Sequence, residues 1–538
     1  MPSASREPEN TIEVFPLPEE VRVERDVSVT MPDGTRLSAN VFLPRNAAGP
    51  LPVVLALTPY DKDIDVREWA ERAIVRRKQI GLGMGRFRVS ECTPFEAPDP
   101  AYWVAAGYAV VHVDVRGRGK SQGQYVAYGR AEIADYPRII EWAGTQSWSN
   151  GRVALHGVSY LAIVQWYAAA EPPPQLAAIV PWEGYADRYR DVLYHGGVPE
   201  TGFHRMWQRM MNPDAPPEAA PEGPSRTPTI SEVRLNQPKI DQIKVPALIC
   251  GSFSDQGLHT KGCFDAFQNI GSQQKWLYTH GRGKWTVYYD DDALAYQRKF
   301  LDHFLKDEDN GMEREPRVRL EVRHTLDRHD VRSEADWPLP STDYRKARLD
   351  AATRSLSFAE ELQESSVTYD TAAGSGASFE LRFDHPAELT GHMKLALTVS
   401  TDAGDDLDLL VGVEKLDARG QVVHFEGREN DPRGLLTNGW LRVSHRELDP
   451  ARSKPWQPFL KHDRVQLVKP HQLVEVDIEL LPSSTYFDAG ESLRLVINGR
   501  DVFSNTMHHH RELCNSGKHT IYTGGSYNSY LLLPVIPK

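Results

Sequence analysis

Short apolar runs that alternate with helix-like segments constrain the fold of this chain more than any other feature. The runs cover residues 53–57, 109–113, 153–156, 177–180 and 247–250. A helix-like segment at 131–145 separates the second run from the third. Strands that are apolar on both faces need helices on both sides, which is typical of a parallel sheet. A turn at 31–34 between two alternating runs predicts an opening β-hairpin before this sheet.

The second half of the chain follows a different pattern. From about residue 355 it consists of short alternating runs, such as 395–400, 409–413, 474–480 and 493–497, separated by Gly, Asn, Asp and Pro. Many short strands with such turns predict a β-sandwich of the jelly-roll type. Between 185 and 242 the sequence is rich in Arg, Met and Trp and then in proline at 213–224. We interpret this stretch as a helical cap with a mobile loop.

These patterns predict three structural parts within 538 residues. A parallel sheet covered by helices occupies 1–184 and 243–345, the cap is inserted at 185–242, and a jelly roll covers 346–538. A chain of this length buries a large core without disulfides.

Charge and cysteine content exclude several classes of function. The 62 Lys and Arg residues against 74 Asp and Glu give a net charge of −12 without a long block of one sign. This argues against nucleic-acid and membrane partners. The four cysteines form no CxxC pair, which favours reduced thiols over a disulfide framework or a zinc finger. The polar, mixed-charge start lacks the apolar run of a secretory signal, so we expect a cytoplasmic protein.

The strongest local signal for chemistry is the stretch from Val153 to Ala170. A strand leads into Gly157-Val-Ser159-Tyr160 and then into a helix that stops at Pro172. A nucleophile elbow needs this strand–turn–helix context, which predicts Ser159 as a nucleophile. The G-x-S-x-G pattern is incomplete, because Leu161 stands where the last glycine belongs. A serine that caps an ordinary helix is the alternative.

A nucleophilic serine needs a base and an orienting carboxylate, and both follow strand-like runs further along the chain. Asp255 comes directly after the run at 247–250, and His280 ends the run at 275–280. Each is a weak signal by itself. The order Ser, Asp, His at strand ends is the order of an α/β-hydrolase triad.

Several further motifs resemble one known family. They are Met31-Pro-Asp-Gly-Thr35, Thr58-Pro-Tyr-Asp-Lys62, the stretch from Asp114 to Gly123, Trp148-Ser-Asn-Gly-Arg152 leading into the elbow, and two closing strands at 517–521 and 529–534. Together they resemble the CocE/NonD serine hydrolases, which are related to the Xaa-Pro dipeptidyl-peptidases and the α-amino-acid ester hydrolases. The resemblance covers nearly the whole chain.

The resemblance implies an α/β-hydrolase domain, an inserted helical cap and a jelly roll. By position it implies that Ser159 attacks the acyl carbon, His280 takes its proton and Asp255 holds the imidazole. The implied oxyanion hole consists of the Tyr60 hydroxyl and the backbone N–H of Tyr160.

The base has an alternative position. Family members usually carry Gly-Pro-Trp-x-His here, and aligning that glycine with His280 puts Lys284 in the place of the histidine. An ammonium group serves as a base only after a large pKa depression. We therefore predict His280.

The predicted function is hydrolysis of a small-molecule ester or amide through an acyl-enzyme, without cofactor or metal. A dipeptidyl-peptidase is one alternative, with Glu183, Asp187, Asp191 and Glu200 as candidates for holding a substrate amino group. An acyltransferase and a catalytically inert binding protein are the others. Whether the chain forms a homodimer is left open.

Overall fold

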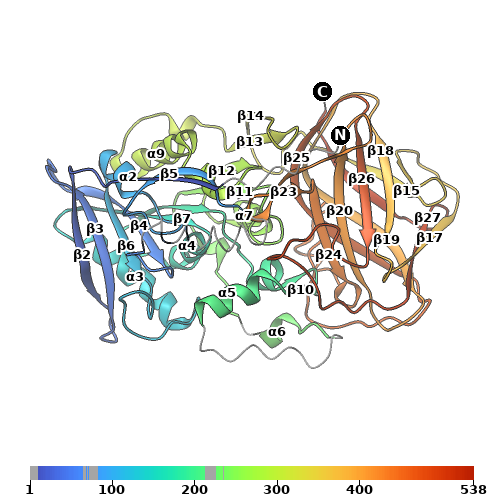
Figure 1. The fold of residues 1–538 in the computed structure, drawn as a ribbon, viewed down its shortest axis with the longest axis horizontal. Coiled ribbons are helices and arrows are strands. Elements are labelled where there is room, and N and C mark those ends of the chain that lie inside the picture. The colour runs from blue at the N-terminus through green and yellow to red at the C-terminus, as the bar shows by residue number, and fades with distance from the viewer. Residues whose placement is uncertain are drawn as a thin grey trace.

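The computed structural model describes residues 10–64, 68, 71, 83–212, 226–233 and 235–537. The proline-rich loop predicted at 213–224 lies outside these residues. Figure 1 shows two parts side by side: a sheet with helices, coloured blue to yellow, and a set of long strands, coloured orange to red.

The first part is built on one mixed sheet. Its strand order is β2 (Val21–Thr30), β3 (Arg36–Pro44), β6 (Ala109–Asp114), β4 (Leu51–Thr58), β7 (Ser149–Val158), β8 (Leu176–Trp182), β11 (Ala247–Ser252), β12 (Lys275–His280), β13 (Val318–Arg323) and β14 (His329–Glu334). The strands from β6 to β13 are parallel, and β2 and β3 form an antiparallel hairpin. Both predictions are confirmed.

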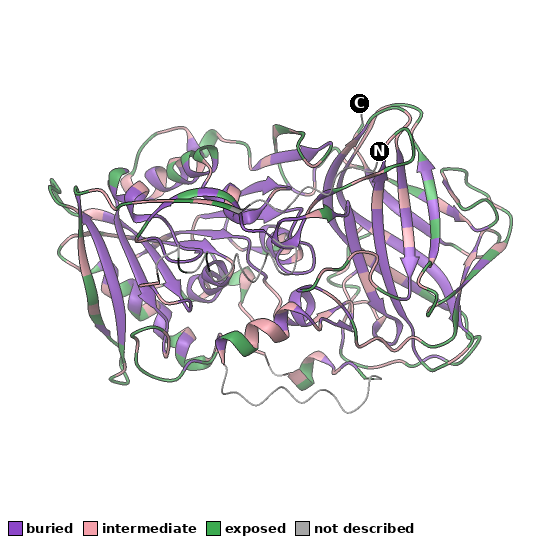
Figure 2. Ribbon diagram, in the orientation of Figure 1, coloured by how far each residue is buried: buried purple, intermediate pink, exposed green. Residues whose placement is uncertain are grey.

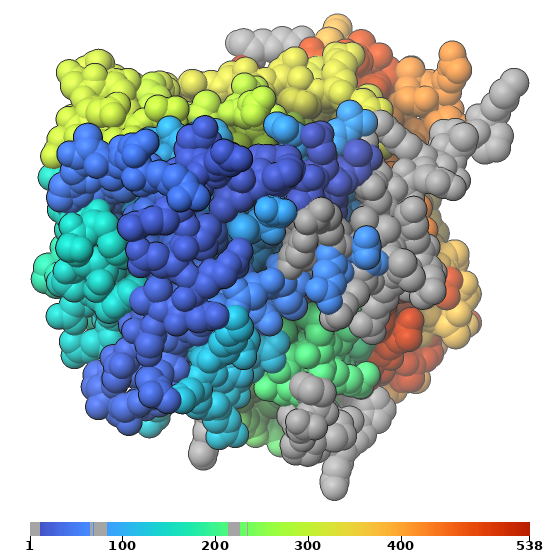
Figure 3. Space-filling model, turned by 60° about the vertical axis from the view of Figure 1, so that its left-hand side comes forward, coloured from blue at the N-terminus to red at the C-terminus, as the bar shows by residue number. Residues whose placement is uncertain are grey.

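Helices cover this sheet because its strands are apolar on both faces. They include α2 (Pro100–Ala105), α3 (Arg130–Gly144), α4 (Tyr160–Ala170), α7 (Thr260–Asn269), α8 (Lys284–Tyr288) and α9 (Asp291–Lys306). The helix predicted at 131–145 is α3, displaced by one residue. A two-stranded sheet of β1 (Asn10–Phe15) and β5 (Gly85–Ser90) accompanies them. In Figure 3 the N-terminal strands, in dark blue, cover one face of this part.

The chain between β8 and β11 forms an insertion with little regular structure. It contains η1 (Tyr189–Leu193), β9 (Tyr194–His195), β10 (Val198–Pro199), α5 (Phe203–Met211), α6 (Ile230–Val233) and η2 (Ile240–Gln242). Arg205 of α5 forms a bidentate pair with Glu512 of the C-terminal part, with N–O distances of 2.6 and 2.7 Å. In Figure 1 helices α5 and α6 lie along the lower side of the molecule.

The C-terminal part consists of antiparallel strands. The longest are β19 (Ala387–Thr401), which pairs with β25 (Val474–Phe487), and β20 (Asp408–Leu416), which pairs with β24 (Thr437–Arg442) and β26 (Ser492–Asn498). The others are β15 (Asp343–Asp350), β16 (Ser355–Ser357), β17 (Ser365–Asp370), β18 (Ala377–Arg382), β21 (Val422–Val423), β22 (Phe425–Gly427), β23 (Asp431–Gly434), β27 (Lys518–Thr523) and β28 (Tyr530–Val535). Their inward faces enclose a second apolar core (Figure 2). The strands predicted at 395–400, 409–413, 474–480 and 493–497 are confirmed.

The two parts are joined through β13. Arg323, at its end, is buried, and its guanidinium donates to the carbonyl oxygen of Leu436 at 3.0 Å and to the Ser483 hydroxyl at 2.7 Å. All four cysteines are free thiols, as expected. Among the helices that the structure describes, none combines the length and the apolar character needed to cross a bilayer.

Candidate active site

Ser159 lies in a sharp turn between β7 and α4. Its backbone has φ 58° and ψ −115°, a conformation that costs a non-glycine residue about 1–3 kcal/mol. The Ser159 N–H is shared between the carbonyl oxygens of Trp182 and Glu183, each at 3.1 Å, which ties the turn to the end of β8. This strained strand–turn–helix geometry is that of a nucleophile elbow.

The incomplete elbow motif has a packing explanation. Gly157 has φ 139°, and a Cβ there would lie 2.5 Å from the Cβ of Leu161. Leu161 therefore fills the space under the turn, and the glycine that the turn needs is Gly157. Leu161 is itself buried. The departure at position 161 leaves the elbow intact.

Ser159 and Asp255 are connected by His259, a residue that the sequence analysis did not select. The Ser159 Oγ lies 3.3 Å from Nε2 of His259, and Nδ1 of His259 lies 2.5 Å from Oδ2 of Asp255. All three side chains are largely enclosed, and the Asp255 and His259 side chains are only 4% and 2% exposed. Because a carboxylate only accepts, Nδ1 of His259 is the donor and Nε2 faces the serine as acceptor.

One turn of chain positions both partners of this pair. Asp255 follows β11, and its N–H donates to the Ser252 hydroxyl at 3.1 Å. Its carbonyl oxygen accepts the N–H of His259, which immediately precedes α7. The spacing of four residues brings the two side chains together, as it does on a helix.

His280 occupies a different place. Among the described residues its ring contacts Glu183 and the backbone of Arg282, with Nε2 2.9 Å from Oε1 of Glu183. It stacks on Trp182 beneath the site and makes no contact with Ser159 or Asp255. His280 pairs in register with Ser252 of β11, and both side chains contact Glu183. The structure thus brings Ser159 and Asp255 together, but not His280.

Lys284 begins α8 and reaches Asp255. Its Nζ lies 3.2 Å from Oδ2 of Asp255 and 3.5 Å from Oε1 of Glu429. Burial alone would raise the pKa of Asp255, but Lys284 and His259 hold that pKa well below its usual range. Burial opposes the charge on Lys284, yet Asp255 and Glu429 hold its pKa above the ordinary value. Lys284 is therefore an ammonium ion and cannot act as a base.

The two predicted oxyanion donors belong to residues whose rings contact each other and form part of an aromatic wall. Tyr60 follows β4 and Tyr160 opens α4, with their rings 6.3 Å apart. Burial raises the pKa of the Tyr60 hydroxyl well above its ordinary value, so this group keeps its proton. Trp207 of α5 stacks on Tyr160 at 5.9 Å and extends the wall into the insertion.

The four carboxylates considered for an amino-group site are already engaged. Oε2 of Glu183 accepts from the Ser252 hydroxyl, Asp187 pairs with Arg190, Asp191 accepts two backbone N–H groups, and Glu200 caps α5. Glu183 also belongs to two groups of side chains that are close enough together to be potential metal ligands. One group includes Cys250 and His280, and the other includes Asp255 and His259. Because His259 contacts Asp255 and His280 contacts Glu183, we interpret these groups as pairs of a histidine with a carboxylate and not as metal sites.

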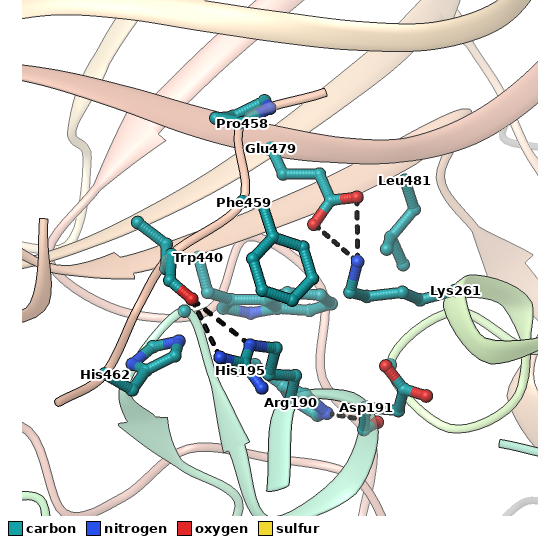
Figure 4. A pocket seen from close by; sticks show the side chains of 13 residues that line it. Arg190, Asp191, His195, Lys261, Trp440, Pro458, Phe459, His462, Glu479 and Leu481 are labelled. Atoms are coloured by element: carbon teal, nitrogen blue, oxygen red, sulfur yellow. Dashed lines mark hydrogen bonds and ion pairs between the residues drawn. The ribbon is translucent and has the colours of Figure 1, made fainter. Parts of the chain in front are cut away.

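A small cavity lies where the insertion, α7 and the C-terminal part meet (Figure 4). Its volume of about 40 Å³ has room for a few water molecules but not for a substrate. Lys261 of α7 crosses its wall to pair with Glu479 of β25 at 2.9 Å. The helix that begins beside His259 is thereby fastened to the C-terminal part.

Comparisons with known proteins identify the family of this chain. Residues 33–229 match the X-Pro dipeptidyl-peptidase (S15 family), and residues 310–532 match the X-Pro dipeptidyl-peptidase C-terminal non-catalytic domain. A crystal structure of a CocE/NonD family hydrolase from Staphylococcus aureus is 39% identical with a TM-score of 0.90, covering 96% of this chain and 93% of that chain. The chain belongs to the CocE/NonD family of serine hydrolases. The resemblance drawn from the motifs is confirmed.

Relatives of this CocE/NonD hydrolase are described with different activities. The cocaine esterase of Rhodococcus sp. (strain MB1 Bresler) is 24% identical over 96% of this chain and 99% of its own length. A putative serine esterase of Mycobacterium bovis is 25% identical over 88% and 90%. A putative Xaa-Pro dipeptidyl-peptidase of Bacillus anthracis is 23% identical over 60% and 58%. The CocE/NonD family therefore includes relatives described as esterases and as peptidases.

Proposed function

We propose that this hydrolase cleaves a carboxylic ester through an acyl-enzyme on Ser159, with His259 as the base and Asp255 as the orienting carboxylate. The observation that carries the proposal is the continuous path from the Ser159 Oγ through His259 to Asp255. His259 replaces His280, which the sequence analysis favoured, because the contacts of the His280 ring lead to Glu183.

The chemistry follows from this path. His259 Nε2 takes the proton from the Ser159 Oγ as the oxygen bonds to the acyl carbon, and returns it to the leaving alcohol as the C–O bond breaks. Water then attacks the acyl-enzyme, His259 takes one of its protons, and the Ser159 oxygen leaves with that proton. The Tyr60 hydroxyl and the Tyr160 N–H are the proposed donors to the oxyanion, and such a donor contributes about 3–4 kcal/mol.

A fluorophosphonate probe tests the nucleophile. We expect the probe to label the wild-type protein and to leave Ser159→Ala unlabelled, with the adduct mapped to Ser159 by mass spectrometry. Labelling that persists in Ser159→Ala would contradict the proposal. Turnover of p-nitrophenyl acetate by the wild type, lost in the same variant, separates an active hydrolase from an inert binding protein of this fold.

A pair of histidine variants tests the base. We expect His259→Ala to lower kcat on p-nitrophenyl acetate by about 10⁴–10⁶-fold, as loss of a triad member does in other serine hydrolases. His280→Ala is the matched control, since it removes a buried imidazole from the same region, and it should keep far more of the activity in whatever folded protein is obtained. The opposite ranking would return the base to His280.

The substrate class and the finer architecture are part of the same proposal. An ester is favoured over a peptide because Glu183, Asp187, Asp191 and Glu200 already have partners within the protein. Acyl transfer is recognised by adding an amine or alcohol acceptor and analysing the products. We further propose that residues 185–242 act as a helical cap and that residues 346–538 form a jelly roll. The proposed partner is a small-molecule substrate, without cofactor.

A further inference from the structure

Lys284 connects the acid of the proposed triad to the C-terminal part. Its side chain is 6% exposed, and that of Glu429 is 2% exposed. Lys284 Nζ lies 3.2 Å from Asp255 Oδ2 and 3.5 Å from Glu429 Oε1. An anion that belongs to the C-terminal part therefore faces the cation next to the site.

His259 and Lys284 share one oxygen of Asp255. Oδ2 accepts from Nδ1 of His259 at 2.5 Å and from Nζ of Lys284 at 3.2 Å. Within the described part of the chain, Oδ1 of Asp255 has no hydrogen-bond partner. When His259 takes a proton during the reaction, two cations face the same carboxylate oxygen. The charge on Lys284 therefore opposes the imidazolium, and an anion beside Lys284 reduces that opposition.

Glu429 is held in a special conformation at this point. It lies in η4 (Arg428–Asn430) with φ 60°, followed by Asn430 with φ 58°. The side chain of Asn430 fills the space in front of two glycines of the hydrolase part. A Cβ at Gly85 or Gly283 would lie within 2.6 Å of its amide atoms. The segment is thus inserted tightly into the hydrolase part, where two left-handed residues are costly unless the surroundings enforce them.

We propose that Lys284 and Glu429 are positioning residues that set the charge beside His259, so that the C-terminal part controls the pH range in which the base works. This inference rests on the proposed function. Lys284 disfavours the protonated form of His259 and keeps the base free at lower pH, whereas Glu429 balances Lys284 and lets the imidazolium form during turnover.

Other charged or titratable groups also face this cluster. They are Glu183 and Tyr185 toward His259, Glu96 and Glu183 toward Lys284, His508 and Arg428 toward Asp255, and His280 behind Glu183. Burial lowers the pKa of His508 well below its ordinary value, so this side chain adds no charge near neutral pH. The remaining groups are the same in each variant below and do not change the sign of the expected effects.

The test is the acid limb of the pH profile of kcat/KM on p-nitrophenyl acetate, which reports the base of the free enzyme. Lys284→Met should move this limb to higher pH, and Glu429→Gln should move it to lower pH, each by about one pH unit. Lys284→Arg and Glu429→Asp keep the charges and should stay close to the wild type. The double variant Lys284→Met/Glu429→Gln should return toward the wild-type limb.

Shifts of the acid limb in opposite directions distinguish this role from a structural one. A structural defect would lower the activity of both variants without moving their acid limbs apart. Limbs that stay in place, or that move in one direction in both variants, would overturn the inference. Thermal unfolding identifies folded variants, and if Lys284→Met does not fold, the shift of Glu429→Gln to lower pH decides alone. Failure of the proposed function is recognised separately, as wild-type protein that the fluorophosphonate probe does not label at Ser159.

Discussion

At the scale of single residues, Glu132 shows how burial controls a group behind the site. Its carboxyl accepts the hydroxyl protons of Tyr136, at 2.6 Å, and of Tyr160, and the N–H of Tyr128 at 2.8 Å. The side chain is fully enclosed, and burial raises the pKa of Glu132 to about 7. It holds the ring of Tyr160, whose N–H is a proposed oxyanion donor.

Glu132 should make stability depend on pH. The unfolded chain releases this proton near pH 4.5, whereas the folded protein keeps it up to about pH 7. The stabilisation is therefore complete below pH 4.5 and is lost as the pH rises to 7, which amounts to about 3 kcal/mol. Denaturant unfolding of the wild type and Glu132→Gln at pH 4.5 to 7.5 measures it. Parallel stability curves would contradict this expectation.

The residues of the site differ in how well the sequence predicts them. Ser159 and Asp255 could be predicted, because each follows an apolar strand that has to end at the same edge of the sheet. His259 could not be predicted in this way, because the usual triad order places the histidine after the next strand, and His280 ends that strand, β12. The available signal was the spacing of four residues in Asp255-Gln-Gly-Leu-His259, directly before a helix.

At the scale of elements, α7 is the helix that carries the proposed base, His259, at its N-terminus. Lys261, near its start, pairs with Asp265 at 2.8 Å and with Glu479 of β25 at 2.9 Å. Gln457 donates to the same two carboxylates. This partly buried network fixes the helix to the C-terminal part and thereby fixes the direction from which His259 approaches Ser159.

Lys261→Met should uncouple this helix. The substitution leaves two neighbouring, partly buried carboxylates without their cation, which costs about 1–3 kcal/mol of unfolding free energy. We also expect kcat on p-nitrophenyl acetate to fall, because His259 loses its fixed position. Lys239→Met is the control, since the Lys239–Glu171 pair is exposed and contributes about 0–1 kcal/mol. Equal losses in the two variants would argue against the anchoring role.

At the scale of the whole molecule, Arg323 joins the two cores. Its guanidinium lies 4.5 Å above the ring of Phe425 and 5.4 Å from that of Phe253, one from each part. The pattern of apolar runs predicts each part separately, because the side chains of each run are buried against the sheet to which that run belongs. The junction could not be predicted, since it depends on contacts such as those of Arg323, which join residues far apart in the sequence.

Arg323→Met should weaken this junction. It removes the guanidinium donor to Leu436 O and Ser483 Oγ, and we expect a loss of about 1–3 kcal/mol. The two parts should then unfold in separate calorimetric transitions. Arg319→Met serves as the control on the same strand, because Arg319 donates within the hydrolase sheet, to the Thr279 carbonyl at 3.0 Å. A single unshifted transition in Arg323→Met would show that other contacts join the parts.

The short distance in sequence between Asp255 and His259 has a consequence for how this enzyme can vary. Asp255 and His259 contact each other within one turn of the chain. The loop between β12 and α8 therefore does not have to bring them together. That loop therefore does not supply the histidine of the proposed triad. A single five-residue stretch thus carries both members of the proposed proton-transfer pair, and a change elsewhere in the chain leaves their spacing in the sequence unchanged.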